Sequence, residues 1–287
     1  MSPTPPADIV LKLSCTDRIG IVHAVSGFLA DHGCNITSSQ QFDDPESGRF
    51  FMRVQARNGG AAELAALRAG FESIAGSFGM DWTMVDAAVP MRVMVLVSKF
   101  DHCLNDMLYR IRSGALRIDI AVIVSNHPDL EPIARAAGIP FEHVPVTPET
   151  KPAAERRLLE LVDEHGAELV VLARYMQVLS DGLCRSLAGR AINIHHSFLP
   201  GFKGAKPYHQ AFERGVKLVG ATAHYVTGDL DEGPIIEQEV FRVDHTYDAR
   251  ALTLAGRDAE RAALFRAVKW HSENKVLLNG HRTVVFP

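Results

Sequence analysis

Two kinds of hydrophobic pattern organise the first 86 residues of the chain. Short apolar runs bounded by turn-forming residues predict strands, whereas apolar residues three and four positions apart predict helices. The predicted strands cover residues 9–14, 36–42, 49–56 and 80–85, and the predicted helices cover residues 21–31 and 61–75. The order strand, helix, strand, strand, helix, strand is that of a ferredoxin-like split sandwich.

From Arg92 onward the chain changes to continuous apolar runs separated by helical stretches. This alternation is typical of a Rossmann-like, mostly parallel α/β sheet whose strands are buried on both faces. The predicted buried strands cover residues 92–98, 118–124, 169–172 and 191–194, and the helices 102–113, 129–137, 149–165 and 180–188. The predicted antiparallel margin covers residues 217–226 and 235–241, followed by a helix over 249–277 and a strand over 283–286.

The two patterns predict two domains joined by a short linker. Residues 9–86 make the smaller N-terminal domain, residues 87–91 the linker and residues 92–287 the larger domain. A chain of 287 residues is long enough for both. Residues 1–8 lack the basic start and the apolar core of a secretory signal, and we expect them to form a disordered leader.

Charge and cysteine usage narrow the function classes. The formal net charge of −4 gives no basic footprint for nucleic acid, and no apolar run approaches the roughly 20 residues that cross a bilayer. The four cysteines are scattered, so neither a disulfide framework nor a cysteine zinc site is expected. We therefore expect a cytoplasmic protein without a nucleic-acid or membrane partner.

Polar residues gather where two predicted strands of the larger domain end. Asn193 and His195 lie two positions apart in one predicted strand, so their side chains point to the same face. Asp231 lies in a later acidic turn that a Gly-Pro pair closes. Ligands of open α/β sheets bind beyond such strand ends. Asn193 and His195 can stabilise an oxyanion and Asp231 can act as a base toward water, which fits acyl transfer at a carbonyl. Asp229 competes for the carboxylate role.

The same region offers a metal site as an alternative. Imidazoles of His195, His196 and His224 and the carboxylate of Asp231 are all zinc ligands. Adjacent residues of an extended segment point to opposite faces, however, so His195 and His196 are not expected to share an ion. We therefore predict no metal and a supporting or packing role for His196. The remaining histidines, among them His102, are expected to be ordinary core or surface residues.

Three segments resemble motifs of the formyltransferase fold family of folate enzymes: Asn193–Pro200, Gly204–Tyr208 and Leu230–Pro234. The resemblance covers residues 92–287 and implies a formyltransferase-type catalytic domain.

The formyltransferase resemblance assigns roles to single residues. It implies that Asn193, His195 and Asp231 are the catalytic trio and that a segment from Arg174 to Leu179 wraps a pterin ring. The substrate-binding residues that it implies are Tyr175, Met176, Gln177, Val178, Leu179, His224 and Gly204.

The N-terminal domain resembles the ACT family of amino-acid-sensing domains. The best local feature is Asp17-Arg18-Ile19-Gly20, where a strand passes into a helix whose N–H groups can bind a carboxylate. The resemblance implies Asp17, Arg18 and Gly20 as regulatory residues for an amino-acid effector, and it implies a homodimer or higher homo-oligomer. An equally weighted alternative is an ordinary helix start capped by Asp17.

An ACT-like domain followed by a formyltransferase-type domain resembles the formyltetrahydrofolate deformylase family. This resemblance implies hydrolysis of 10-formyltetrahydrofolate to formate and tetrahydrofolate, with no metal or other cofactor. One alternative is formyl transfer to an amine, as in glycinamide ribonucleotide transformylases. Those enzymes cradle a phosphate on a glycine-rich loop, whereas the corresponding loop here, residues 98–103, has no glycine and contains Asp101. The other alternative is a non-catalytic regulator that binds folate or an amino acid.

Overall fold

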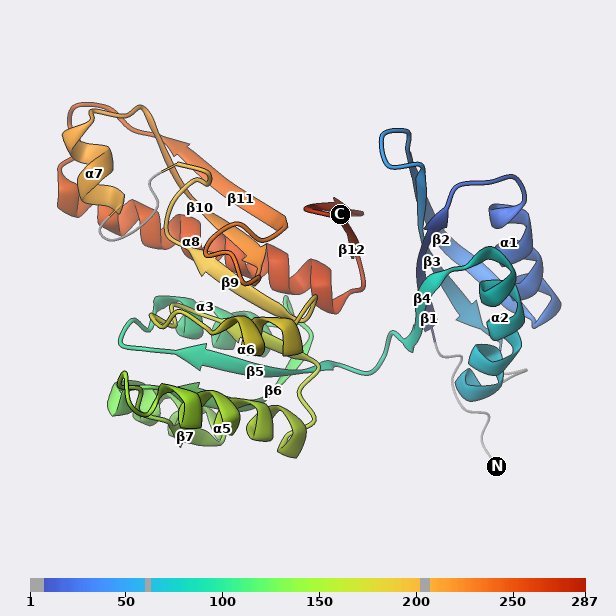
Figure 1. The fold of residues 1–287 in the computed structure, drawn as a ribbon, viewed down its shortest axis with the longest axis horizontal. Coiled ribbons are helices and arrows are strands. Elements are labelled where there is room, and N and C mark those ends of the chain that lie inside the picture. Colours follow the sequence, from blue (N-terminus) through green and yellow to red (C-terminus); the bar gives the residue numbers. More distant parts are fainter. Residues whose placement is uncertain (1–7, 60–62, 202–206) are drawn as a thin grey trace. The chain divides into compact units, whose positions relative to one another are not determined.

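The computed structural model describes residues 8–59, 63–201 and 207–287. The leader predicted for residues 1–8 therefore lies, apart from Asp8, outside the described residues. Within the chain two compact units form, one from Met1–Pro90 with Glu273–Pro287 and the other from Met91–Ser272 (Figure 1). The last residues thus belong to the N-terminal unit, whereas the sequence analysis assigned all of 92–287 to the second domain.

The N-terminal unit has the predicted strand and helix order. Its elements are β1 (Asp8–Thr16), α1 (Ile21–Asp31), β2 (Cys34–Asp44), β3 (Arg49–Asn58), α2 (Leu64–Phe78) and β4 (Asp81–Asp86). The sheet has the order β2-β3-β1-β4 with antiparallel neighbours. Both helices bury their apolar stripes against one face of this sheet, where Leu13, Val25, Leu67 and Phe71 are fully buried.

A C-terminal hairpin completes the N-terminal unit. β12 (Val276–Asn279) pairs antiparallel with β13 (Arg282–Val285). Leu277 of the hairpin packs in a cluster with Phe51 of β3. Phe51 alternates with residues that face the helices, so this cluster covers the opposite face of the sheet. The Nδ2 atom of Asn279 donates a hydrogen bond of 2.6 Å to Oδ2 of Asp44, which fixes the hairpin to β2.

The helix predicted for residues 249–277 is shorter than expected. The observed helix α8 (Ala249–Ser272) stops before Asn274, whose φ of 54° lies in the left-handed region that a right-handed helix does not contain. Val276 and Leu277 belong to strand β12 instead. The prediction was wrong there because two apolar residues fit the helix pattern and the strand pattern equally.

The second unit alternates strands and helices as predicted. Its first elements are β5 (Met91–Val97), α3 (His102–Arg112), β6 (Ile118–Ser125), η1 (Pro128–Leu130), α4 (Glu131–Ala137), β7 (Phe141–His143), α5 (Lys151–Glu164), β8 (Leu169–Leu172) and α6 (Asp181–Ser186). They are followed by β9 (Ala191–His195), α7 (Pro207–Glu213), β10 (Leu218–Tyr225), β11 (Ile235–Arg242) and α8. The short elements β7 and α7 were not predicted.

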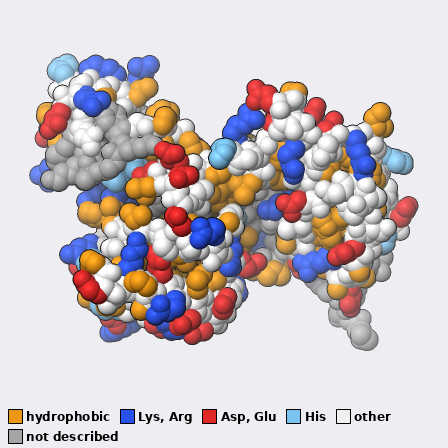
Figure 2. Space-filling model, viewed as in Figure 1, with side chains coloured by type: hydrophobic (Ala, Val, Ile, Leu, Met, Phe, Trp, Pro, Cys, Tyr) orange, Lys and Arg blue, Asp and Glu red, His pale blue; other side chains and the backbone are white. Residues whose placement is uncertain are grey.

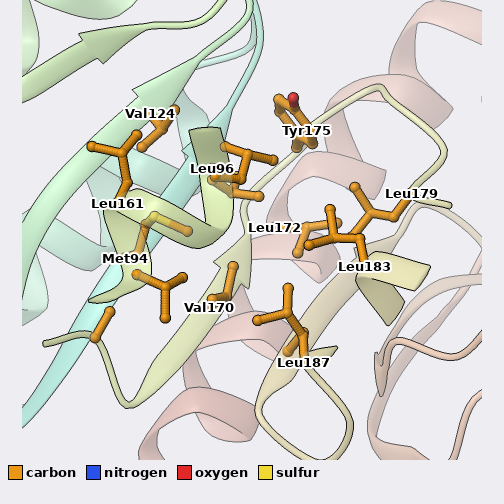
Figure 3. Close-up of a cluster of buried hydrophobic side chains, with 14 of the residues drawn as sticks. Met94, Leu96, Val124, Leu161, Val170, Leu172, Tyr175, Leu179, Leu183 and Leu187 are labelled. Carbon is orange, nitrogen blue, oxygen red and sulfur yellow. The ribbon is translucent and has the colours of Figure 1, made fainter. Parts of the chain in front are cut away.

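One sheet runs through the second unit in the order β11-β10-β9-β8-β5-β6-β7. The strands from β9 to β7 are parallel, while β10 and β11 are antiparallel, as expected for the margin. Parallel strands are buried on both faces by helices, and on one face the core includes Met94, Leu96, Val170 and Leu172 (Figure 3). This sheet carries the candidate site at the ends of β8, β9 and β10.

On the face drawn in Figure 2, both units carry positive and negative side chains with hydrophobic side chains among them. Among the described residues, no helix has both the length and the apolar character that crossing a bilayer requires.

Candidate active site

Neighbouring strands bring the first candidate residues together. Asn193 and His195 lie two positions apart in β9, so they share a face of the sheet. β10 runs antiparallel to β9 and places His224 directly opposite Asn193. Opposite residues of an antiparallel pair also share a face. Three side chains that the sequence analysis assigned to one site therefore meet on one face of the second unit.

His195 and Asp231 form the central contact of this group. Nδ1 of His195 lies 3.1 Å from Oδ1 of Asp231, and the two side chains are 5% and 11% exposed. The second ring nitrogen of His195, Nε2, is buried and has no hydrogen-bond partner. Since Nδ1 is engaged by the carboxylate, Nε2 is the ring atom that remains for a ligand.

Electrostatics keep Asp231 ionised. Burial alone would raise the pKa of this carboxyl group, but the hydrogen bond from His195 and the electrostatic interaction with that imidazole outweigh it and lower the pKa from its usual 3.8. His224 shows the reverse balance, because burial lowers the pKa of its imidazole and favours the neutral ring.

His224 orients the amide of Asn193. Nδ1 of His224 lies 2.9 Å from the carbonyl oxygen of Tyr225, so this nitrogen carries the hydrogen. Nε2 is then an acceptor, and Nδ2 of Asn193 donates to it over 3.3 Å. An amide has two N–H donors, so one remains for a substrate oxygen. His224, which was predicted to face the site, thus holds one N–H of Asn193 and leaves the other for a ligand.

The loop between β10 and β11 holds Asp231 in an unusual conformation. Asp231 has a φ of 58°, which a non-glycine residue rarely adopts. A backbone hydrogen bond of 2.9 Å from the N–H of Tyr225 to the carbonyl of Pro234 closes the base of this loop. A Cβ atom at Gly233 would lie only 1.7 Å from the carbonyl oxygen of Tyr225. Glycine is therefore required there for the loop to fold back.

Asp229, the other candidate for the carboxylate role, stabilises the turn through its backbone carbonyl. Its carbonyl oxygen accepts hydrogen bonds from Oγ1 of Thr227 at 3.1 Å and from the N–H of Glu232 at 3.3 Å. No ion pair joins Asp229 to a histidine among the described residues, whereas Asp231 contacts both His195 and His224. The geometry therefore favours Asp231 for a role in catalysis.

The segment predicted to wrap a pterin ring follows β8. All five residues from Tyr175 to Leu179 line a cavity together with the Asn193, His195 and Asp231 group. The N–H of Met176 donates a 3.0 Å hydrogen bond to Oγ of Ser98, which itself donates over 2.6 Å to Asn126. Ser98 thus fixes the start of the segment.

Tyr175 and Leu179 anchor the segment in the core, whereas Met176 and Val178 are half exposed. Figure 3 shows Leu179 beside Leu172 and Leu183, and Tyr175 at the edge of the same cluster. Burial raises the pKa of Tyr175 to about 12, so its phenol is neutral.

The cavity has the size of a small-molecule site. Its volume is about 610 Å³, within the range of about 300–1,000 Å³ that is usual for ligand pockets. Its walls come from the segment after β8, the ends of β9 and β10, the loop that carries Asp231, and α8. Gly204, also predicted to bind substrate, lies outside the described residues.

A second polar cluster in the same cavity was not predicted as part of the site. Nε2 of His102 lies 2.7 Å from Oε2 of Glu260, whose Oε1 accepts a 3.2 Å hydrogen bond from Tyr208. Arg174 completes the cluster at 3.4 Å from Oε2. Burial would raise the pKa of Glu260, but His102 and Arg174 outweigh it and lower the pKa, so the carboxylate is ionised.

His102, which was expected to be an ordinary core or surface histidine, lines the cavity with its ring. A signal was present in the sequence. Glu260 lies on an otherwise apolar helix face with Leu252, Ala263 and Leu264, and a buried carboxylate needs a partner. The identity of that partner could not be inferred, because His102 and Glu260 are 158 positions apart.

The group of described residues with the spacing of metal ligands differs from the group considered in the sequence analysis. Among the described residues, His102, Cys103 and Glu260 form the group whose ligand atoms lie within 4.8 Å of one another. His195, His224 and Asp231 do not form such a group. Burial raises the pKa of the Cys103 thiol well above 9.0, which disfavours the thiolate that binds metals.

The loop predicted to be regulatory lies in the N-terminal unit. Gly20 precedes α1 with a φ of 101°, and no side chain caps the helix, so the alternative of Asp17 as the cap was wrong. The N–H of Asp17 instead donates a 3.0 Å hydrogen bond to the carbonyl of Gly48. The guanidinium of Arg18 bonds the carbonyl of Ser77 and lies 4.3 Å above the Phe78 ring.

Two family profiles match the chain. The formyl transferase family matches residues 91–268 and the ACT domain family matches residues 9–69. The predicted fold class, an ACT domain followed by a mostly parallel formyltransferase domain, is thereby confirmed.

Two similar proteins span both domains of this chain. A formyltetrahydrofolate deformylase from Corynebacterium sp. is 56% identical over 96% of this chain and 97% of its own. The crystal structure of a formyltetrahydrofolate deformylase from Burkholderia mallei is 54% identical, has a TM-score of 0.95 and covers 98% of this chain and 100% of its own.

Glycinamide ribonucleotide transformylases match only part of the chain. The enzyme from Symbiobacterium toebii is 32% identical with a TM-score of 0.64, and it covers 69% of this chain and 95% of its own. The deformylase relatives match the N-terminal unit as well as the second unit. The chain therefore belongs to the formyltetrahydrofolate deformylase family.

Proposed function

We propose that the protein hydrolyses 10-formyltetrahydrofolate to formate and tetrahydrofolate, and that Asn193, His195 and Asp231 carry the reaction. The observation that carries the proposal is the convergence of an oriented amide donor, an unpartnered imidazole nitrogen and an ionised carboxylate in one cavity. These are the donors and the acceptor that water attack on a formyl carbon requires.

The formyl oxygen is bound by two donors in this scheme. Asn193 supplies the amide N–H that His224 leaves free. Nε2 of His195 supplies the second donor when the ring is protonated, and Asp231 at 3.1 Å balances that positive charge. Both contacts strengthen as the carbonyl becomes an oxyanion, so they stabilise the transition state more than the substrate.

Asp231 accepts the proton of the attacking water and relays a proton to N10. One carboxylate oxygen holds His195, and the other accepts a hydrogen bond from water. The low pKa keeps the group ionised, and the water proton becomes acidic enough to transfer only as its oxygen bonds the formyl carbon. The C–N10 bond then breaks, N10 takes a proton relayed through Asp231, and the formic acid released ionises to formate.

The folate is held by the segment from Tyr175 to Leu179. Met176 and Val178 present half-exposed apolar side chains to the cavity, which suits the faces of a pterin ring. The backbone N–H and carbonyl groups of the segment can pair with the polar edge of the ring, and Gln177 adds an amide. Gly204 remains a predicted substrate contact.

No metal or other cofactor enters this scheme. The ring nitrogens around the trio are already engaged, since Nδ1 of His224 bonds a carbonyl and its Nε2 accepts from Asn193. Nδ1 of His195 bonds Asp231. Of the ring nitrogens of His195 and His224, only Nε2 of His195 remains, and one nitrogen beside one carboxylate is fewer than the three protein ligands of a catalytic zinc site. Activity is expected to persist after dialysis against EDTA.

Hydrolysis rather than transfer is favoured by the loop after β5. Ser98 uses its hydroxyl to position Met176, and Phe100 stands beside Arg174. The family resemblance puts these side chains where glycinamide ribonucleotide transformylases have a glycine-rich phosphate loop. The direct test supplies 10-formyltetrahydrofolate without any amine: stoichiometric formate and tetrahydrofolate support hydrolysis. An absolute requirement for an added amine would make the protein a transformylase, and folate binding without turnover would favour a regulator.

For the N-terminal unit we propose an amino-acid effector bound near Asp17, Arg18 and Gly20. The ACT family match and the uncapped start of α1 support this assignment. Isothermal titration with the standard amino acids, repeated with Asp17→Ala, tests it. A homodimer or higher homo-oligomer stays a prediction, which size-exclusion chromatography with light scattering will decide.

A further inference from the structure

The Arg174 guanidinium has donors that the protein itself does not use. Its side chain is 10% exposed and lies 3.4 Å from Oε2 of Glu260 through Nε. This distance is that of an ion pair, but neither Nε nor Nη1 makes a hydrogen bond. Leaving buried charged donors unpaired is costly, so an occupant that pairs with them would be bound with a matching gain. Arg174 lines the cavity that holds the trio.

The backbone supports a specific use of this side chain. Arg174 has a φ of 67°, a conformation that glycine adopts freely and other residues adopt at a cost. Among the described non-glycine residues, only Asp231 and Asn274 share a positive φ. Strained positions collect at functional sites, and Asp231 is one of the trio. A large charged side chain at such a position is therefore best explained by a role in the cavity.

The surroundings of Arg174 favour a small anion. Its guanidinium carbon lies 5.4 Å from the centre of the Phe100 ring, and the guanidinium carbon of Arg257 lies 5.3 Å from the same ring. Arg257 has no ion-pair partner within the described part of the chain. Two guanidinium groups thus lie near one ring, and Glu260 forms an ion pair with Arg174. A guanidinium fork matches the two oxygens of a carboxylate.

The trio and Arg174 line the same cavity, and the rings of His196 and Tyr208 connect the trio with the cluster around Glu260. The ring of His196 lies 5.1 Å from that of His195, and the next ring along, that of Tyr208, lies 6.4 Å from His196 and bonds Glu260. Burial, followed by the charges of Arg174 and His195, lowers the pKa of His196 to about 4. The neutral His196 ring therefore does not compete with Arg174 for an anion.

We propose that Arg174, assisted by Arg257, forms a subsite for a small carboxylate and receives formate as it leaves the trio. The inference rests on the proposed function for the identity of the ligand. The subsite separates the product anion from the ionised Asp231, and it gives the departing formate a partner before it reaches solvent. Formate is therefore expected to be a product inhibitor that acts through Arg174.

Binding of formate to the free protein tests the proposal without turnover. Carbon-13-labelled formate is titrated against the wild type, Arg174→Gln and Arg257→Gln, and its NMR line width is followed. Removing a charge-assisted contact weakens a ligand by about 10- to 100-fold, so Arg174→Gln is expected to bind formate at least about tenfold more weakly. Arg257 is half-buried, so Arg257→Gln is expected to weaken formate binding less, by about threefold. Arg261→Gln, on the same helix in an exposed pair with Asp258, should bind as the wild type does.

Three outcomes overturn the subsite. They are unchanged formate binding by Arg174→Gln, no binding by the wild type, and displacement of formate by p-aminobenzoyl-glutamate, which would assign Arg174 to the folate tail. If Arg174→Gln fails to fold by circular dichroism, Arg174→Lys and Arg257→Gln carry the test. If turnover releases formate but formate binding does not depend on Arg174, the subsite is refuted and the hydrolysis stands. If formate binding depends on Arg174 but no turnover occurs, only the hydrolysis is refuted.

Discussion

Nδ1 of His195 and Oδ1 of Asp231 lie 3.1 Å apart in a site where both side chains are nearly buried. The contact commits one ring nitrogen to the carboxylate and leaves the other, Nε2, unpartnered in the cavity. It also stabilises the ionised form of Asp231. One hydrogen bond thereby sets both the direction in which His195 can donate and the state in which Asp231 can accept.

Replacing Asp231 by Asn removes the proton acceptor and the counter-charge of His195 together. We expect kcat to fall by about 10²-fold or more, the magnitude typical of acid–base and oxyanion contributions. Steady-state assays of formate release measure it. The matched control is Asp229→Asn in the same loop, whose carbonyl rather than its side chain holds the turn. Equal losses in the two variants would contradict the assignment.

Acidification should destabilise the protein in part through His196. Burial, with the charges of Arg174 and His195, lowers the pKa of this ring from 6.5 to about 4 in the folded state. The unfolded chain therefore binds a proton first, and the stability that His196 contributes above pH 6.5 is lost as the pH falls toward 4. Urea unfolding across this window should show a smaller decline for His196→Gln than for the wild type. An identical pH profile would refute the assignment.

Gly233 should tolerate no side chain. A Cβ atom there would lie 1.7 Å from the carbonyl oxygen of Tyr225, so Gly233→Ala must displace the loop that carries Asp231. We expect a loss of about 1–3 kcal/mol in the free energy of unfolding, as overpacking usually costs, with a fall in kcat. The control is Gly182→Ala, whose Cβ would meet Ser180 at an ordinary 3.8 Å. Thermal unfolding and kcat measure both variants.

Ser98 is expected to act on folate binding rather than on chemistry. Its hydroxyl accepts from the N–H of Met176 over 3.0 Å, so Ser98→Ala frees the start of the pterin segment. Losing one buried hydrogen bond costs about 1–3 kcal/mol, and we expect KM to rise about tenfold while kcat changes little. Ser113→Ala, at an exposed serine, is the control. A fall in kcat with unchanged KM would place Ser98 elsewhere in the mechanism.

The sequence was sufficient to predict the alternation of strands and helices in both units, because buried parallel strands and amphipathic helices have distinct periods. It was also sufficient to bring Asn193 and His195 onto one face. It did not predict the end of α8, where Val276 fits both periods. It also missed the cluster around Glu260, because contacts across 158 positions leave no local pattern. The positive φ of Arg174 is likewise invisible in a sequence.

The central claim is that water accepts the formyl group, and oxygen-18 water tests it most directly. The protein is incubated with 10-formyltetrahydrofolate in labelled water with EDTA and without an amine, and the formate is analysed by mass spectrometry. Hydrolysis through the trio predicts one labelled oxygen in each formate molecule, at a rate that Asp231→Asn lowers. Unlabelled formate, or product that appears only with an added amine, would contradict the account.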